Sequence, residues 1–331
     1  MTMTAEEWAP AKGADALYAS PNGNWIGAQY NLAGPPPLIK IFDRATGAVK
    51  ATARGQLAGR PNDDGEAFYL DGDAAVRSTT RADFRVQLPG DKDEFWRAYR
   101  TKSRVIVTHG GGADGGKYFI AAIRTDQPKL DRSREIAVGP DFRLVAATAG
   151  DAPLFFVSAQ QPRAQAPASK GAVIALDEVT LEDRWRAPWK PETLYEQHPA
   201  LGLTGDGTEV VANTGTSELH AIAVSGGKTD GFVKLPVLWD YVDLQPVPDA
   251  RAVIVLSRSK ARSAAANEAD VLRVDFPSGK VTQLWSLPKK EYSQPRALVV
   301  VGDRVLLAPG HGDRFPNDRS TWGAEVTDYV K

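Results

Sequence analysis

Three carboxylate residues lie within one five-residue segment, Asn62-Asp63-Asp64-Gly65-Glu66. Neighbouring carboxylates repel one another when they are ionised, and a divalent cation relieves that repulsion. Calcium prefers hard oxygen ligands of this kind. The segment lacks the Asp-x-Asp-x-Asp-Gly pattern of an EF-hand, so a solvated turn is the alternative interpretation. Asp63, Asp64 and Glu66 are therefore candidate ligands for calcium or another divalent metal.

A second set of polar residues could bind a metal ion or move protons. The segment Gly310-His311-Gly312-Asp313-Arg314 combines an imidazole, a carboxylate and a guanidinium, and His198 ends an earlier loop. Imidazole titrates near neutral pH and is the commonest metal ligand. Two His need another kind of ligand to complete a zinc site, and the chain contains no Cys. One hypothesis is therefore a hydrolase or lyase that uses His198, His311 and the carboxylates of residues 63–66.

Aromatic residues form a third set, and their chemistry suits binding. Exposed Trp and Tyr side chains offer a large apolar face with a polar tip, which is why they anchor protein interfaces and sugar sites. The alternative is that these rings pack inside the molecule. The set is Trp189, Tyr195, Trp239, Tyr241 and Tyr292, with Asp240 between two of its members. Since no nucleophile, base and orienting group can be assembled by spacing, the sequence favours a non-catalytic protein.

The elements that must position these residues recur along the chain. A strand-like run breaks at a tight turn and resumes as a second apolar strand, and this happens seven times. The repeats are roughly 40 to 55 residues apart, which is typical of propeller blades. Six blades with a large insertion are the alternative. The turns are Pro21-Asn22-Gly23, Asp71-Gly72-Asp73, Gly110-Gly111-Gly112, Gly150-Asp151, Gly205-Asp206-Gly207, Asp249-Ala250 and Gly302-Asp303.

The first repeat is the clearest, with strands predicted at 16–19, 25–30, 38–42 and 48–53. Its segments 19–26 (Ala-Ser-Pro-Asn-Gly-Asn-Trp-Ile) and 41–47 (Ile-Phe-Asp-Arg-Ala-Thr-Gly) resemble the "SPDG … D-x-x-TG" signature of seven-bladed β-propellers of WD40-like, TolB-like and YVTN-like type. The resemblance implies an all-β fold of seven four-stranded antiparallel blades. It does not imply a function, because the loops of a propeller determine its activity.

Closure of the ring requires one more strand. After the predicted strand at 304–307 only 323–330 is convincingly strand-like, and an open array would leave an unpaired edge. We therefore expect the N-terminal segment to complete the last blade. Residues 95–99 are predicted to form an outer strand, with a helix over 91–99 as the alternative. Trp96, Trp185 and Trp285 are expected on outermost strands.

The long connections are expected on one face of the propeller. If the strands of each blade are A to D from the axis outward, these connections are predicted to be B–C or D–A loops, and the aromatic set falls on D–A loops entering blades five to seven. Long loops on a rigid scaffold often carry function. The segments concerned are 55–65, 158–170, 188–198, 257–268 and 309–321.

Composition limits the classes of function. The 331 residues carry a formal net charge of −1 and no linker-like stretch, which predicts a single domain over residues 1–331 and argues against nucleic-acid binding. Apolar runs are too short for membrane insertion. The N-terminus lacks the features of a signal peptide, so we expect a cytoplasmic protein, or a periplasmic or secreted one if a leader was removed. We expect a soluble monomeric platform for a protein or glycan partner, or else a structural subunit of a larger assembly.

Overall fold

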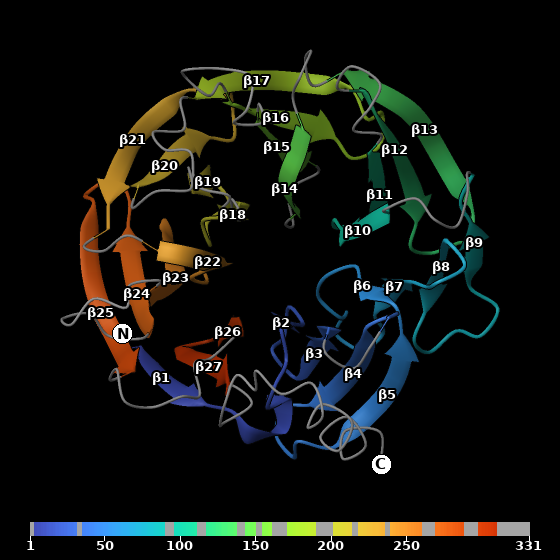
Figure 1. The fold of residues 1–331 in the computed structure, drawn as a ribbon, viewed down its shortest axis with the longest axis horizontal. Coiled ribbons are helices and arrows are strands. Elements are labelled where there is room, and N and C mark those ends of the chain that lie inside the picture. Colours follow the sequence, from blue (N-terminus) through green and yellow to red (C-terminus); the bar gives the residue numbers. More distant parts are fainter. Residues whose placement is uncertain are drawn as a thin grey trace, which may run out of the picture.

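The computed structural model is a seven-bladed β-propeller, in which seven sheets form a ring about a central axis (Figure 1). The all-β class and the seven-blade arrangement predicted from the sequence are thus confirmed. The structure describes residues 3–31, 35–89, 96–110, 117–137, 143–149, 154–160, 171–189, 201–213, 218–235, 239–259, 269–287 and 297–309. Within these ranges the only helix is the 3-10 turn η1 (Ala9–Ala11), and no helix is long and apolar enough to cross a membrane.

Six blades are four-stranded antiparallel sheets whose strands follow one another in sequence. The first three contain β2 (Ala16–Ala19), β3 (Trp25–Tyr30), β4 (Leu38–Asp43) and β5 (Val49–Arg54); β6 (Gln56–Leu57), β7 (Phe68–Leu70), β8 (Ala75–Ser78) and β9 (Arg85–Gln87); and β10 (Trp96–Arg100), β11 (Arg104–Gly110), β12 (Lys117–Arg124) and β13 (Leu130–Ala137). The next three contain β14 (Arg143–Ala149), β15 (Leu154–Gln160), β16 (Gly171–Asp177) and β17 (Asp183–Trp189); β18 (Leu201–Leu203), β19 (Glu209–Asn213), β20 (Glu218–Ala223) and β21 (Thr229–Lys234); and β22 (Trp239–Pro246), β23 (Ala252–Ser259), β24 (Ala269–Asp275) and β25 (Lys280–Leu287). The seventh sheet contains β26 (Ala297–Val301), β27 (Arg304–Ala308) and β1 (Thr4–Glu7).

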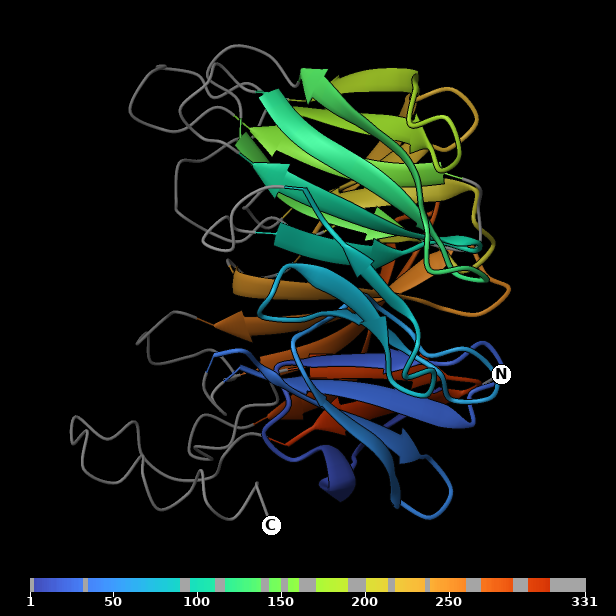
Figure 2. The same ribbon diagram turned by 90° about the vertical axis from the view of Figure 1, so that its right-hand side faces the viewer.

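Each blade runs outward from the axis, so its strands are A to D in order, with β2, β6, β10, β14, β18, β22 and β26 innermost (Figure 1). Since the strands alternate in direction, the A–B and C–D turns lie on one face of the disc and the B–C and D–A connections on the other. We call these the A–B face and the B–C face. Figure 2 shows the strands from the side, running between the two faces.

The core consists of seams between neighbouring blades. Alternate residues of a strand point to opposite sides of its sheet, and in the sixth blade Val253 and Val255 pack toward the fifth blade whereas Ala252 and Ile254 pack toward the seventh. All four side chains are fully buried. Both sides of each blade are therefore apolar, which explains the near-continuous hydrophobic strands in the sequence.

The N-terminal segment closes the ring, as predicted. Strand β1 pairs with β27 over Thr4–Glu7, and Met3 and Ala5 pack into the core of the seventh blade. The detail differs from a four-stranded antiparallel blade, because β1 is parallel to β27 and lies directly beside it. Among the described residues this sheet has three strands, and the strand predicted at 323–330 lies outside them.

The predicted turn chemistry is present at the first and fifth blades. The hydroxyl of Ser20 accepts a 3.0 Å hydrogen bond from the backbone N–H of Trp25, and the hydroxyl of Thr204 accepts one of 3.1 Å from Glu209. In both cases the same oxygen donates to the side chain at the turn's centre, Asn22 or Asp206. The two A–B turns therefore have the same construction.

The second and third blades correct the predicted strand order. The turn at residues 71–73 joins β7 to β8, and the Gly-rich segment at 110–112 follows β11, so both are B–C connections instead of A–B turns. Trp96 begins an innermost strand, β10, and the prediction of an outer strand at 95–99 was wrong in position. Trp185 and Trp285 do lie on the outermost strands β17 and β25.

Candidate functional site

The predicted metal-binding segment, residues 62–66, lies in the A–B connection of the second blade. It follows β6, so it is on the A–B face and not among the B–C and D–A loops, where it was expected. The first blade holds it in place. The Asp63 carboxylate accepts a 2.8 Å hydrogen bond from the backbone N–H of Asn22, and the Asp63 carbonyl accepts bonds from the Asn22 amide and the Trp25 indole.

The next residues of this segment contact the same blade. The ammonium group of Lys50 lies 4.0 Å from the centre of the Trp25 ring and donates to the Asp64 carbonyl. Gly65 has φ +83°, and a Cβ there would lie 2.8 Å from the Trp25 indole. Only glycine adopts this conformation and permits this approach without strain. Through these contacts the segment connects the second blade to the first.

Glu66 has a different environment from the two aspartates. It is buried, and one carboxylate oxygen accepts hydrogen bonds from the Arg81 Nε at 2.6 Å and the Ser78 hydroxyl at 2.5 Å. Its other oxygen accepts from the Asn62 amide at 3.3 Å. Arg81 in turn donates to the carbonyl of Thr125 in the third blade. Glu66 therefore anchors an arginine that bridges two blades.

The three carboxylates have separate protein partners. Asp63 and Asp64 are exposed and Glu66 is buried, and among the described residues no three His, Asp or Glu side chains are grouped so as to hold a metal ion. Calcium binding by Asp63, Asp64 and Glu66 remains a prediction.

Two arginines lie next to this segment at the inner end of the seam between the second and third blades. Arg100 ends the innermost strand β10 and donates a 3.1 Å hydrogen bond to the carbonyl of Arg60. Burial is the main cause that lowers the pKa of both side chains, and the positive charge of Arg60 lowers that of Arg100 further. Nearby carboxylates, including Asp63, oppose both shifts.

The described part of the aromatic set lies on strands. Trp239, Asp240 and Tyr241 begin β22, an innermost strand, instead of forming the loop that precedes it. A β-bulge interrupts the pairing with β23, because Trp239 pairs with Ser259 and Tyr241 with Arg258. Bulges redirect side chains and are common beside functional sites. These three residues are at the B–C-face end of the strand that borders the central axis.

The seam between the fifth and sixth blades becomes polar toward the B–C face, the face at which β22 begins. Its apolar part includes Val211 of the fifth blade with Val255 and Leu272 of the sixth. Alternation places Asn213, Ser257 and Asp270 on the same sides, two residues from those three, and all are buried.

The polar residues of this seam carry hydrogen-bonding groups that are costly to bury. The Ser257 hydroxyl is fully buried and has no hydrogen-bond partner among the residues that the structure describes. Ser257 pairs across the strands with both Val242 and Asp270. Asp270 accepts a 3.1 Å hydrogen bond from the Gln283 amide. A buried hydroxyl without a partner is uncommon in folded proteins, and such a group is a candidate for binding something beyond the chain.

The remaining predicted site residues are only partly placed. Trp189 ends β17, the outermost strand of the fourth blade, so it is on the rim while Trp239 is beside the axis. Trp189 and Trp239 therefore lie on strands at different distances from the axis, one outermost and one innermost. The predicted residues outside the described ranges are Tyr195, His198, Tyr292, His311, Asp313 and Arg314.

Comparison with known proteins supports the fold without narrowing the function. No family model matches the chain, and no curated protein matches it. Among solved structures 1116 chains are similar. One, described as "KlHsv2 with loop 6CD replaced by a Gly-Ser linker", has a TM-score of 0.56 and 8% sequence identity, with 89% of each chain covered. The chain is thus a β-propeller, a fold that hosts both binding proteins and enzymes.

Proposed function

We propose that this propeller is a non-catalytic binding platform and that a protein or glycan partner binds its B–C face over the fifth and sixth blades. The observation that carries the proposal is that the seam between the fifth and sixth blades changes from apolar to polar at that face. Buried Ser257 and Asp270 lie there on β23 and β24, the two strands that follow β22, which begins with Trp239 and Tyr241. Aromatic residues with a few convergent polar groups are typical of recognition sites.

The alternatives make different use of the surface. A structural subunit would present its apolar residues on the rim, and the large exposed apolar side chains of the described residues are Val49, Val179 and Phe232. Val49 and Phe232 are on the outermost strands β5 and β21. They are separated by several blades and form no single patch, so a rim interface has less support than the B–C face. A metal-dependent hydrolase or lyase remains the alternative for the channel mouth.

The proposal is tested with the double variant Trp239→Ala/Tyr241→Ala in binding assays against an array of glycans and against extracts of the source cells. We expect this variant to lose partners that the wild-type chain retains. Phe232→Ala is the matched control, because it removes an aromatic side chain that is 64% exposed on the rim. Loss of binding in the control, with retention in the double variant, would instead support a structural subunit.

A further inference from the structure

The seventh blade differs from the other six in the direction of its outermost described strand. Each of the other blades has four strands that alternate in direction, whereas the described part of the seventh has three and ends with the parallel pair β27–β1. Strand β27 is a strand B and runs from the A–B face to the B–C face, and β1 runs the same way. A strand D also has this direction. The strand that the described part of this blade lacks therefore runs from the B–C face to the A–B face.

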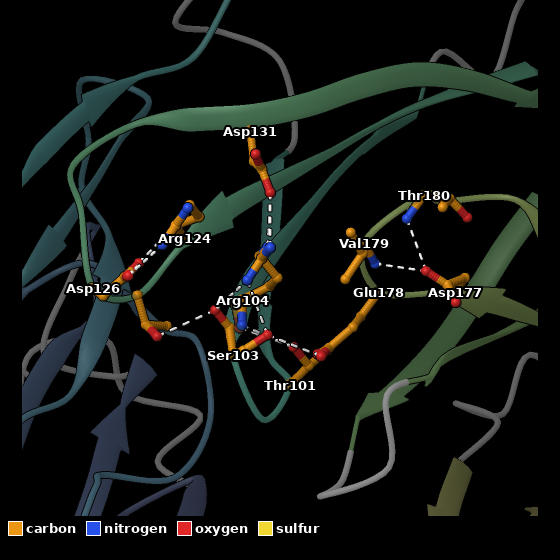
Figure 3. Close-up of polar contacts among 11 residues, drawn as sticks. Thr101, Ser103, Arg104, Arg124, Asp126, Asp131, Asp177, Glu178, Val179 and Thr180 are labelled. Carbon is orange, nitrogen blue, oxygen red and sulfur yellow. Dashed lines mark hydrogen bonds and ion pairs between the residues drawn. The ribbon is translucent and has the colours of Figure 1, made fainter.

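Strand β1 also begins beside the preceding blade, as a strand D does after its C–D turn. Figure 3 shows such a turn, in which Glu178 of the fourth blade accepts a 2.9 Å hydrogen bond from Ser103 in the A–B turn of the third. In the seventh blade Met3 directly precedes β1 and packs in a buried cluster with Val247, which lies in the A–B turn of the sixth blade. The start of β1 is therefore anchored at the A–B face.

The edge of β1 that faces away from β27 can accept another strand. The backbone N–H of Thr4 donates a 3.1 Å hydrogen bond to the carbonyl of Asp303, which identifies the side of β1 that faces β27. Alternate residues direct their N–H and C=O groups to opposite sides, so those of Ala5 and Glu7 point away from β27. No strand of the described ranges pairs with this edge. An edge of this kind is a template for a further strand.

The chain leaves the seventh blade at the face where the lacking strand has to begin. The carbonyl of Pro309 accepts a 2.8 Å hydrogen bond from the N–H of Gly13, which lies in the connection from β1 to β2 on the B–C face. Residues 310–331 follow, outside the described ranges. The far edge of β1 is two strand spacings from β27, about 10 Å, and residues 310–322 can cover that distance. The next segment, 323–330, is Gly-Ala-Glu-Val-Thr-Asp-Tyr-Val, and its Val, Thr and Tyr residues favour a strand.

We propose that the edge of β1 is a docking site for residues 323–330 of the same chain, which pair with β1 as the fourth strand of the seventh blade and run antiparallel to it. The direction follows from the entry at the B–C face, because a parallel strand would require the chain to cross the blade first. A tethered segment has an effective concentration of the order of millimolar, so it competes well against a second copy of the protein. The added strand covers the edge that β1 would otherwise expose.

Disulfide formation in the full chain tests the pairing and its direction, because the chain contains no Cys of its own. Glu7→Cys should form a disulfide with Ala324→Cys or with Glu325→Cys within one molecule, since an antiparallel strand brings these positions together at the B–C face. Glu7→Cys with Val330→Cys is the matched control and should not react, because the two residues would be roughly 20 Å apart. The proposal is wrong if only the control pair reacts, if no pair reacts, or if the disulfide joins two molecules, which would identify a second copy as the occupant.

Hydrogen exchange tests the same pairing without added cysteines. We expect the amides of 323–330 to exchange at least about tenfold more slowly in the wild-type protein than in an unstructured chain. Val326→Pro or Thr327→Pro should abolish this protection and lower the urea midpoint, because one of these two N–H groups faces β1 and proline has none. Ser320→Pro, in the preceding connection, should behave as the wild type does. Fast exchange over 323–330 in the wild type, or an unchanged midpoint in both proline variants, would overturn the proposal.

Discussion

The indole of Trp185 in the fourth blade packs directly on Gly227 in the C–D turn of the fifth, where a Cβ would lie 2.7 Å from the ring. Its Nε1 donates a 2.8 Å hydrogen bond to the Val224 carbonyl of the same turn. An outermost strand of one blade is thus joined to the next blade by one side chain. Trp25 makes an equivalent contact with Gly65 at the junction of the first and second blades.

Gly227→Ala should lower the free energy of unfolding by about 2 kcal/mol, because Gly227 has φ +71° and the new methyl group would displace the indole. Urea denaturation measures the change. Gly226→Ala is the matched control, since a Cβ at Gly226 would meet nothing within 4 Å. Equal losses in the two variants would show that the contact with Trp185 has no part in the effect.

Removal of residues 1–7 should destabilise the protein and promote aggregation. Met3 is 9% exposed within the core of the seventh blade, and its burial alone contributes about 2 kcal/mol. The truncation also exposes the edge of β27, which β1 covers. Denaturant unfolding and light scattering test both effects.

Glu6→Gln is the control for this truncation. It removes only the ion pair with Arg304, in which both side chains are at least half exposed, and such pairs contribute less than about 1 kcal/mol. A truncated protein that unfolds at the same urea concentration as the wild type and stays monomeric would contradict the role of β1 in closure.

The fold was predictable from the sequence in those blades whose tight turns contain the residues that favour such turns. The first blade was predicted almost to the residue because its two tight turns carry the residues that define them, Asn22 with Gly23 in one and Asp43 with Gly47 in the other. The second blade was not, because its strand A is only Gln56–Leu57. Two residues show no alternation, so the sequence pattern indicates the next strand as strand A of this blade. The same shift places Trp96 of the third blade on an outermost strand, whereas it begins the innermost strand β10.

The site was less predictable because its contacts cross between blades. The sequence shows three carboxylates together at 62–66, but it does not show that Trp25 and Lys50 bind the same segment. Those contacts follow from the packing of one blade on the next, at separations of 38 and 14 residues.

Glu66→Ala should cost about 3 kcal/mol of stability, because it leaves Arg81 and Ser78 without their acceptor at the junction of two blades. Equilibrium unfolding in urea gives the value. Asp64→Asn is the comparison, as it alters an exposed carboxylate in the same segment and keeps an oxygen that can accept from the Glu66 N–H. If the two variants lose similar stability, the network around Arg81 contributes little.

Asp206 should make part of the protein's stability depend on acid pH. Burial of Asp206 opposes its ionisation, but hydrogen bonds from Thr204 and Thr208 outweigh this effect and lower its pKa below the usual 3.8. The folded state therefore binds this proton less readily than the unfolded chain does. The contribution is complete above a pH of about 5 and is lost as the pH falls through 3.8 toward the lowered pKa.

Asp206→Asn should remove this contribution and make the unfolding free energy less dependent on pH below about 5, when the urea midpoint is measured across the acid range. The assignment would be wrong if Asp206→Asn lost stability equally at every pH, since the side chain would then act only through hydrogen bonds that an amide oxygen cannot replace.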